Sequence, residues 1–349
     1  MVDRSEHNRK VRWKAVQSVL MAYRKGSPLQ PIAPSENPQL SFGQERLWFL
    51  NQLGVDNTVY NLPFAFWMDG VLDVTALEKS LREILRRHDI LRTIFPSVGA
   101  QPVPVIAPTC NLRLSVTDLQ QLAPAEQEAQ YQVITQTEIS RPFDLAQGPL
   151  WRFQLLRFTA EKYVLLMTIH HIIYDGWSQS VFTKELSILY KDFSTGQSSS
   201  LPDLPIQYAD FAHWQRQWLT GEILQSQRAY WQHQLAGARP TLNLPFERPQ
   251  AVQPDSLMTY KGERQPVEFS PDQTAALQKL GDRQGVRLFV VLLAAFNLLL
   301  YQYTKQEDII VCSTQAGRNL TKVQGLIGFF NTLVPLRTDL SGNPSFLEL

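Results

Sequence analysis

Short runs of almost wholly apolar residues alternate along the chain with stretches in which apolar residues recur at helical spacing. Helical spacing begins at Ser41 and again at Thr75, where Glu78 stands in the capping-box position. Residues 163–169 form a short, almost wholly apolar run, which is typical of a strand covered on both faces. A further strand is predicted at residues 90–95. Together these elements indicate an α/β (α+β) fold.

The same alternation returns in the C-terminal part of the chain, after a stretch with little periodicity. Residues 245–258 contain three prolines and read as a linker. Two helices and one strand are predicted beyond it, at residues 271–283, 288–303 and 308–314. We therefore predict an N-terminal lobe at residues 38–244 and a C-terminal lobe at residues 259–349.

The N-terminal residues 1–37 are predicted to form a basic helix followed by a linker. Residues 1–26 carry seven Lys or Arg residues against two acidic residues. Residues 9–25 place their apolar side chains near one helical face. A loosely docked terminal helix, a docking helix for a partner protein and a helix at a membrane surface all fit this pattern.

The composition limits the classes of function. A net charge of +1 gives no reason to expect a nucleic-acid partner. Cys110 and Cys312 stand in no metal-ligand spacing, so no metal site is predicted, and both are expected to be buried. The apolar residues 288–301 are too few for a membrane span and include Asn297, so they predict a core helix. Without a secretory signal, the protein is predicted to be cytoplasmic.

Two adjacent histidines, His170 and His171, follow the strand predicted at residues 163–169. Successive side chains of a strand point to opposite faces, so one histidine would face a site and the other would lie inside the lobe. Asp175 and Gly176 suit the turn that comes next. A helix is predicted after this turn.

Three interpretations of the histidine pair compete. A zinc site is disfavoured, because adjacent residues cannot easily chelate one ion and no Cys or Glu stands nearby at ligand spacing. Two core histidines at a strand end are a simple alternative. A neutral imidazole that takes a proton from an attacking amine or hydroxyl is the third. The dipeptide alone leaves the last two open.

The order of these residues resembles a known family. His170, His171, Asp175 and Gly176 match the HHxxxDG motif of condensation domains of nonribosomal peptide synthetases, which chloramphenicol-acetyltransferase-type enzymes share in part. Four further segments resemble the family's other motifs in the same order, at residues 40–50, 86–95, 208–214 and 327–337. In these segments packing is the simplest role for most side chains, including His88.

This resemblance implies a fold and a reaction. Two chloramphenicol-acetyltransferase-like lobes would form a V with a tunnel between them. Carrier proteins would present their thioester substrates on phosphopantetheine arms from either side, and the domain would bind no cofactor of its own. The amine of a carrier-bound aminoacyl acceptor would attack a donor thioester, held on a carrier or on coenzyme A, and form an amide.

The resemblance also assigns roles in the histidine motif. His171 would face the tunnel and deprotonate or position the attacking amine. His170 and Asp175 would support it, with Asp175 in a buried salt bridge. Arg318 is the preferred partner for Asp175, and Arg92 is the alternative.

Other residues would line the substrate path. Gly176 would lie on the acceptor side, where a bulkier residue could block the arm. Trp177, Ser178 and Asn331 would line the tunnel, with Asn331 donating a hydrogen bond near the thioester carbonyl. The sequence departs from the family pattern here, because Phe330 meets Asn331 with no apolar residue between them. A shift of one residue on a strand turns side chains to the other face.

The family's sixth and seventh motifs are absent from the sequence. The second lobe is therefore expected to be incomplete, with unpaired strand edges or exposed core. A truncated, non-catalytic module that binds carrier proteins is the alternative to an active condensation domain. An upstream synthetase could dock through the N-terminal helix. The donor could be an L-aminoacyl, D-aminoacyl or fatty acyl group.

Overall fold

A computed structural model of the chain describes residues 28–33, 37–54, 57–239, 241–245 and 265–349. The helix predicted at residues 9–25 and all but the first residue of the linker at 245–258 lie outside this described part. Contacts divide the chain into two units: Met1–Ile223 with Ala316–Thr332, and Leu224–Gln315 with Leu333–Leu349. This division and the predicted lobes differ in two places: residues 224–244 group with the second unit and residues 316–332 with the first.

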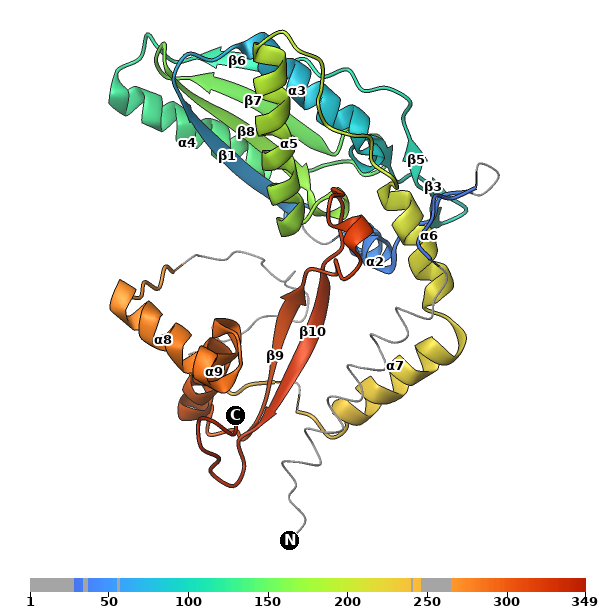
Figure 1. Ribbon diagram of the computed structural model, residues 1–349, viewed down its shortest axis with the longest axis vertical. Helices are drawn as coiled ribbons and strands as arrows, with labels where there is room; N and C mark the ends of the chain where they lie inside the picture. The colour runs from blue at the N-terminus through green and yellow to red at the C-terminus, as the bar shows by residue number, and fades with distance from the viewer. Residues whose placement is uncertain (1–27, 34–36, 55–56, 240, 246–264) are drawn as a thin grey trace. The chain divides into compact units, whose positions relative to one another are not determined.

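The first unit is built on a four-stranded sheet in the order β1-β8-β7-β6 (Figure 1). Its strands are β1 Asn61–Asp69, β6 Ser115–Asp118, β7 Trp151–Arg157 and β8 Lys162–His170. β1 and β7 pair antiparallel with β8, and β6 pairs parallel with β7. Every residue of β8 after Lys162 is buried, so the strand predicted at residues 163–169 is confirmed as covered on both faces.

Helices lie on both faces of this sheet. α3 Val74–Arg87 and α5 Gly176–Ser194 cover one face, and α4 Pro124–Ser140 lies against the other (Figure 1). The larger core is on the α5 side, where Phe66 and Phe153 contact Phe182. No residue of α4 is buried, so this helix covers its face only loosely.

Shorter elements surround the sheet of the first unit. They are α2 Phe42–Gln52, α6 Tyr208–Trp218, η1 Asp89–Arg92, η2 His171–Ile173, η3 Thr321–Val323, β2 Thr93–Ile94, β3 Ser97–Val98, β4 Gln101–Pro102 and β5 Val105–Ile106. Helix α2 begins at the predicted position, because Ser41 and Gln44 form a reciprocal capping box with two bonds of 3.1 Å.

Two local predictions are wrong. Asp73, not Thr75, caps α3, since its carboxylate accepts a backbone N–H of the first turn at 2.9 Å. Glu78 instead accepts a backbone N–H from outside the helix at 2.8 Å. The strand predicted at residues 90–95 is instead most of a 3₁₀ turn followed by a two-residue strand. The segment stays turned because the Thr93 hydroxyl donates a hydrogen bond to the carbonyl four residues earlier.

The second unit contains helices and a small sheet. Its elements include α7 Gly221–Gln234, which begins in the first unit, α8 Pro271–Gln284, α9 Leu288–Thr304, β9 Asp308–Gln315 and β10 Thr332–Asp339. In the described part of the chain, β9 and β10 pair only with each other. One face of α9 is buried at Val291, Ala294, Asn297 and Leu300. Four large apolar side chains of the same helix are exposed: Phe289, Phe296, Leu299 and Tyr303. The prediction of a core helix therefore holds for one face of α9 only.

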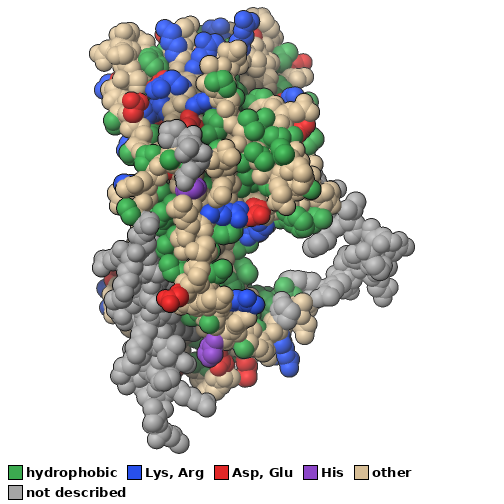
Figure 2. All heavy atoms as spheres, turned by 90° about the vertical axis from the view of Figure 1, so that its right-hand side faces the viewer, with side chains coloured by type: hydrophobic (Ala, Val, Ile, Leu, Met, Phe, Trp, Pro, Cys, Tyr) green, Lys and Arg blue, Asp and Glu red, His purple; other side chains and the backbone are tan. Residues whose placement is uncertain are grey.

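The surface carries both charged and apolar side chains. Figure 2 shows Lys and Arg side chains gathered at one end of the first unit.

Cys110 is half-buried and Cys312 is exposed, so the expected burial of both cysteines is wrong. Among the described residues no single helix has the length and apolar composition to cross a membrane, although α8 and α9, bent by 104°, meet both criteria as a pair.

Candidate active site

The two motif histidines lie on either side of a change in backbone conformation. β8 ends at His170, and the 3₁₀ turn η2 begins at His171. The two side chains are therefore separated by the end of the strand, and not by the strand alternation that the sequence pattern predicts. His170 is 1% exposed, whereas His171 is half-buried.

His171 is held in one tautomer with one ring nitrogen free. Its Nδ1 lies 2.6 Å from the Tyr174 carbonyl oxygen, so Nδ1 carries the hydrogen and donates it. Nε2 then keeps its lone pair, and no group among the described residues bonds to it. The Phe329 ring packs edge-to-face on the imidazole, with ring centroids 4.8 Å apart. A free Nε2 on a fixed imidazole is the group that a proton acceptor requires.

His170 has the opposite environment. Its Nδ1 accepts the Ile172 backbone N–H at 3.1 Å, so Nε2 carries the hydrogen. Phe143 and Tyr60 pack around the ring, each with its centroid 6.1 Å away. Burial, followed by the neighbouring His171, lowers the pKa of His170 to about 3. The ring is therefore neutral near pH 7 and serves the packing of the first unit.

Asp175 joins the start of α5 to a distant segment. Its Oδ1 accepts the Ser178 N–H at 2.8 Å and the Ser178 hydroxyl at 2.7 Å, which caps the helix. Its Oδ2 accepts the Phe330 N–H at 3.1 Å. Arg318 Nη2 donates to Oδ1 at 3.0 Å, and both side chains are almost completely buried. The carboxylate is thereby fully paired, as a buried charge requires.

Arg318, rather than Arg92, is the partner of Asp175. Its Nη1 also donates to the Val323 and Leu326 carbonyls, at 2.7 Å and 2.6 Å. Burial lowers the pKa of this guanidinium, and Asp175 opposes that shift. Arg92 instead donates to the Leu85 carbonyl at 3.0 Å and pairs with an aspartate three residues earlier.

Residues 327–330 form a tightly held segment next to His171. Ser178 Oγ accepts the Gly328 N–H at 3.0 Å, and the Tyr208 hydroxyl donates to the Phe329 carbonyl at 2.5 Å. A Cβ atom at Gly328 would lie 2.0 Å from the Tyr208 ring, so only glycine fits there. These contacts explain why residues 316–332 belong to the first unit and why Phe329 stays against His171.

The predicted path-lining residues have different surroundings. Gly176 is exposed, and an added Cβ would meet nothing within 4 Å. Trp177 is 42% exposed, with its indole N–H bonded to the Gln324 carbonyl at 2.9 Å. Ser178 is completely buried in the Asp175 network, so its predicted place in a substrate path is corrected to a structural one. Asn331 is half-buried immediately before β10.

Four residues that support the site were not predicted as site residues from the sequence. Gln44 Nε2 donates to the Ile172 carbonyl at 3.1 Å, within the turn that carries His171. The Ser41 and Tyr208 hydroxyls lie 2.8 Å apart. Phe329 forms the wall against His171. All of them lie in the segments at residues 40–50, 208–214 and 327–337, so the motif resemblance was the available signal.

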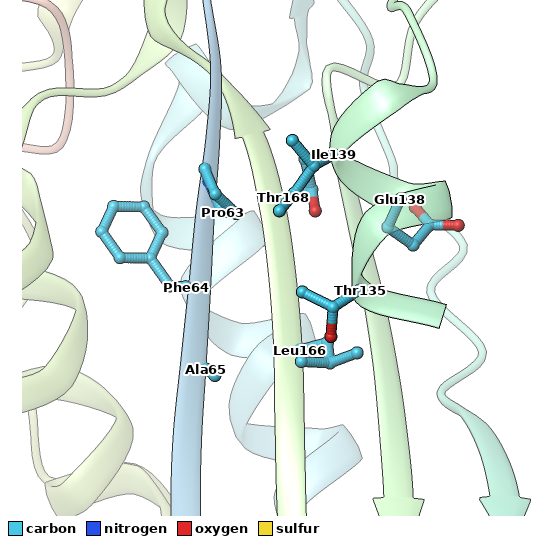
Figure 3. A pocket seen from close by; sticks show the side chains of 8 residues that line it. All are labelled: Pro63, Phe64, Ala65, Thr135, Glu138, Ile139, Leu166 and Thr168. Carbon is cyan, nitrogen blue, oxygen red and sulfur yellow. The ribbon is translucent and has the colours of Figure 1, made fainter. Parts of the chain in front are cut away.

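A separate pocket lies on the other face of the sheet, beneath α4 (Figure 3). Its volume is about 190 Å³, and Ala65, Leu166 and Thr135 are among its lining residues. Neither His171 nor Asp175 lines it. Within the described ranges no group of three or more His, Cys, Asp or Glu residues is placed to hold a metal ion.

The fold and the histidine site together define a class of protein. Residues 35–349 match the family model described as Condensation domain. The chain therefore belongs to the condensation domain family, and the mixed α/β fold agrees with this assignment.

The curated relatives are large synthetases. The chain is 45% identical over 320 residues to one of the linear gramicidin synthase proteins of Brevibacillus parabrevis, and the match covers 91% of this chain and 6% of that protein. It is 36% identical over 322 residues to phosphinothricin tripeptide synthetase PhsB of Streptomyces viridochromogenes, covering 91% of this chain and 26% of that protein. The chain thus spans only a small part of these relatives.

Solved structures share the fold over most of the chain. The X-domain from teicoplanin biosynthesis has a TM-score of 0.79 and is 27% identical, covering 92% of this chain and 70% of that one. The first condensation domain of the calcium-dependent antibiotic synthetase has a TM-score of 0.74 at 18% identity, and the match covers 90% of this chain and 72% of that one. The second comparison bears on the fold alone.

Proposed function

We propose that the chain catalyses amide formation between an acyl donor thioester and the amine of a carrier-bound aminoacyl acceptor. The observation that carries this proposal is the half-buried imidazole of His171, whose Nδ1 donates to the Tyr174 carbonyl and whose Nε2 is free. The 45% identity to a linear gramicidin synthase protein and the 36% identity to a phosphinothricin tripeptide synthetase support the same reaction class.

The proposed step needs no cofactor of the domain itself. The acceptor nitrogen attacks the thioester carbonyl, and the electron pair of the carbonyl moves to oxygen. When the tetrahedral intermediate collapses, the C–S bond breaks, and the departing thiolate takes a proton. His171 Nε2 accepts the hydrogen of the attacking amine, either by removing it or by a hydrogen bond that positions the nitrogen. Both roles require a neutral ring with Nε2 free.

Holding the reactants in place is the larger part of the proposed catalysis. Two thioesters positioned in line can recover about 7–11 kcal/mol of barrier that a bimolecular reaction would lose to entropy. Phosphopantetheine arms on donor and acceptor carrier proteins would supply this positioning; coenzyme A could replace the donor carrier. An exposed Gly176 with open space beside it suits the passage of such an arm.

The proposal also covers the protein partners and the cellular location. An upstream synthetase is proposed to dock through the N-terminal residues, which lie outside the described part of the chain. The two free cysteines fit a cytoplasmic protein. Neither nucleic acid nor a membrane is proposed as a partner.

A second candidate function is a binding module that makes no bond. The X-domain, which is 28% identical to this chain in one solved structure, is seen there in a complex with OxyB. A chain with the same fold could likewise bind carrier proteins or another enzyme without catalysing amide formation.

One experiment separates the two candidates. Donor and acceptor carriers loaded with thioesters are mixed with wild-type chain, His171→Ala, or His233→Ala as a control at an exposed histidine. Catalysis predicts product from the wild type and the control, and a rate about 10²–10⁴-fold lower in His171→Ala. Equal rates in all three would overturn the role of His171. Carrier binding without product from the wild type would favour the binding module.

A further inference from the structure

A second buried polar cluster lies in the first unit, outside the histidine motif. Arg87 of α3 donates from Nε and Nη2 to the two carboxylate oxygens of Glu185 on α5, both at 3.2 Å. His88, the residue that follows α3, places Nε2 3.1 Å from Glu185 Oε2. The three side chains are buried, with His88 only 1% exposed. None of them takes part in the proposed reaction.

The hydrogen bonds of His88 define its tautomer. The Ile327 backbone N–H donates to His88 Nδ1 at 3.3 Å, so this nitrogen is unprotonated. Nε2 then carries the hydrogen and donates it to Glu185. Burial acts to raise the pKa of Glu185, but the bonds from His88 and Arg87 lower it overall, so the carboxylate is charged. Because the charged Glu185 carboxylate keeps the hydrogen on Nε2 of His88, Nδ1 keeps the lone pair that accepts the Ile327 N–H.

Ile327 begins the segment that carries Phe329. Asp175 accepts the Phe330 N–H of this segment, and Ser178 accepts the Gly328 N–H. Neither of them bonds to the Ile327 N–H. His88 therefore holds the Ile327 N–H, while Arg318 holds the Leu326 carbonyl of the same peptide group at 2.6 Å.

The Phe329 ring is confined from the other side as well. A Cβ atom on Gly43 would lie 2.9 Å from the Phe329 ring, so α2 closes the space behind it. The Phe329 ring also packs edge-to-face with the His171 imidazole, with the ring centroids 4.8 Å apart. A shift of the backbone at Ile327 would thus be passed to His171 through Phe329.

We infer that His88 is a positioning residue for His171, acting through the Ile327 N–H and the Phe329 ring. The effect on catalysis rests on the proposed function, whereas the effect on the His171 ring does not. The cluster of Arg87, His88 and Glu185 is then a second support of the candidate active site, beside Asp175 and Arg318.

Two substitutions at one position separate the two bonds of His88. In His88→Asn the amide oxygen takes the place of Nδ1, so the bond from the Ile327 N–H is kept and the bond to Glu185 is lost. In His88→Gln the amide nitrogen reaches the place of Nε2, so the bond to Glu185 is kept and the bond from Ile327 is lost. Each variant loses one buried hydrogen bond, so they are matched controls for each other.

The first measurement is the NMR signal of the His171 ring protons, which the Phe329 ring current shifts. Phe329→Leu gives the reference position without that ring. We expect His88→Gln to move the His171 signals toward those of Phe329→Leu, and His88→Asn to leave them near the wild type. Unchanged signals in His88→Gln would overturn the inference, whether or not the chain makes amides.

The second measurement is the rate of amide formation with the same variants. His88→Gln is expected to lower kcat by about 10–100-fold with little change in KM, because a small misplacement of a reacting group costs this much. His88→Asn should restore most of that loss. In the Phe329→Leu background His88→Gln should add less than about twofold, since residues that act through one another are not additive. Equal losses in the two His88 variants would contradict a positioning role.

A third measurement needs no variant. The ¹⁵N shifts of the His88 ring in the wild type should report an unprotonated Nδ1 and a protonated Nε2. The opposite tautomer cannot accept the Ile327 N–H and would overturn the inference even if both variants fail to fold. If the wild type makes no amide, the proposed reaction fails, and the ring-proton shifts of His171 still decide the role of His88.

Discussion

Two buried ion pairs hold the segment at residues 327–330, and they do so differently. Asp175 accepts backbone N–H groups from both its own helix and the segment, so it joins them directly. Among the described residues Glu185 accepts only from the side chains of Arg87 and His88, and it reaches the segment through the His88 ring. Loss of Asp175 should therefore affect folding, whereas loss of the Glu185 cluster should mainly loosen the segment next to His171.

The two buried histidines near these ion pairs differ in the hydrogen-bond partners of their ring nitrogens. His88 and His170 are each 1% exposed. Both ring nitrogens of His88 have partners, but Nε2 of His170 has none among the described residues. A buried histidine without a carboxylate partner has no means of stabilising a second proton, so its neutral form is strongly favoured.

The largest effect is expected for Asp175→Ala. The substitution leaves the Arg318 guanidinium buried without its counter-ion and frees the Phe330 N–H. We expect a loss of about 3–5 kcal/mol in the free energy of unfolding. Urea unfolding followed by circular dichroism measures it, with the exposed Asp282→Ala as control. A loss of similar size in both variants would remove the special role of Asp175.

The next effect is a dependence of stability on pH. The folded pKa of His170 is about 3, below its ordinary value of 6.5, so the unfolded chain binds the proton first as the pH falls. The stabilisation is complete above pH 6.5 and is lost toward pH 3, on the order of 4 kcal/mol. In His170→Asn the side-chain oxygen can still accept the Ile172 N–H, but nothing titrates. This variant should lose less stability between pH 6.5 and pH 4; equal slopes would contradict the assignment.

Arg87→Lys tests the Glu185 cluster with the charge kept. A lysine cannot form the paired bonds to Glu185 or reach the Pro202 carbonyl, which Arg87 Nη1 meets at 2.9 Å. We expect a loss of about 2 kcal/mol, smaller than for Asp175→Ala because both charges of the ion pair remain. Thermal unfolding measures the loss. A destabilisation as large as that of Asp175→Ala would mean that the two clusters contribute equally to folding.

Asp73→Ala gives the scale of a polar contact outside both clusters. Its carboxylate caps α3 at a partly exposed position, so removal should cost about 1 kcal/mol. Thr75→Ala, at the position that the sequence pattern favoured, should cost less. The reverse order in thermal unfolding would show that the capping interaction has been assigned to the wrong residue.

The sequence predicted those elements whose signal is local. β8 is a short apolar run, and α8, α9 and β9 have clear periodicity and lie within about two residues of their predicted bounds. The pairing of His171 with a turn at Asp175 also follows from adjacent residues. Each of these features depends on contacts between near neighbours in the chain, which a single sequence displays.

The tertiary structure decided what depends on distant contacts. It selected Arg318 over Arg92 as the partner of Asp175, and it brought residues 316–332 into the first unit. It buried Ser178 and separated His170 from His171 by ending a strand. His88 and Ile327, 239 positions apart, meet only in the fold. No spacing rule joins such residues, because their hydrogen bonds form only after the helices and the sheet have packed.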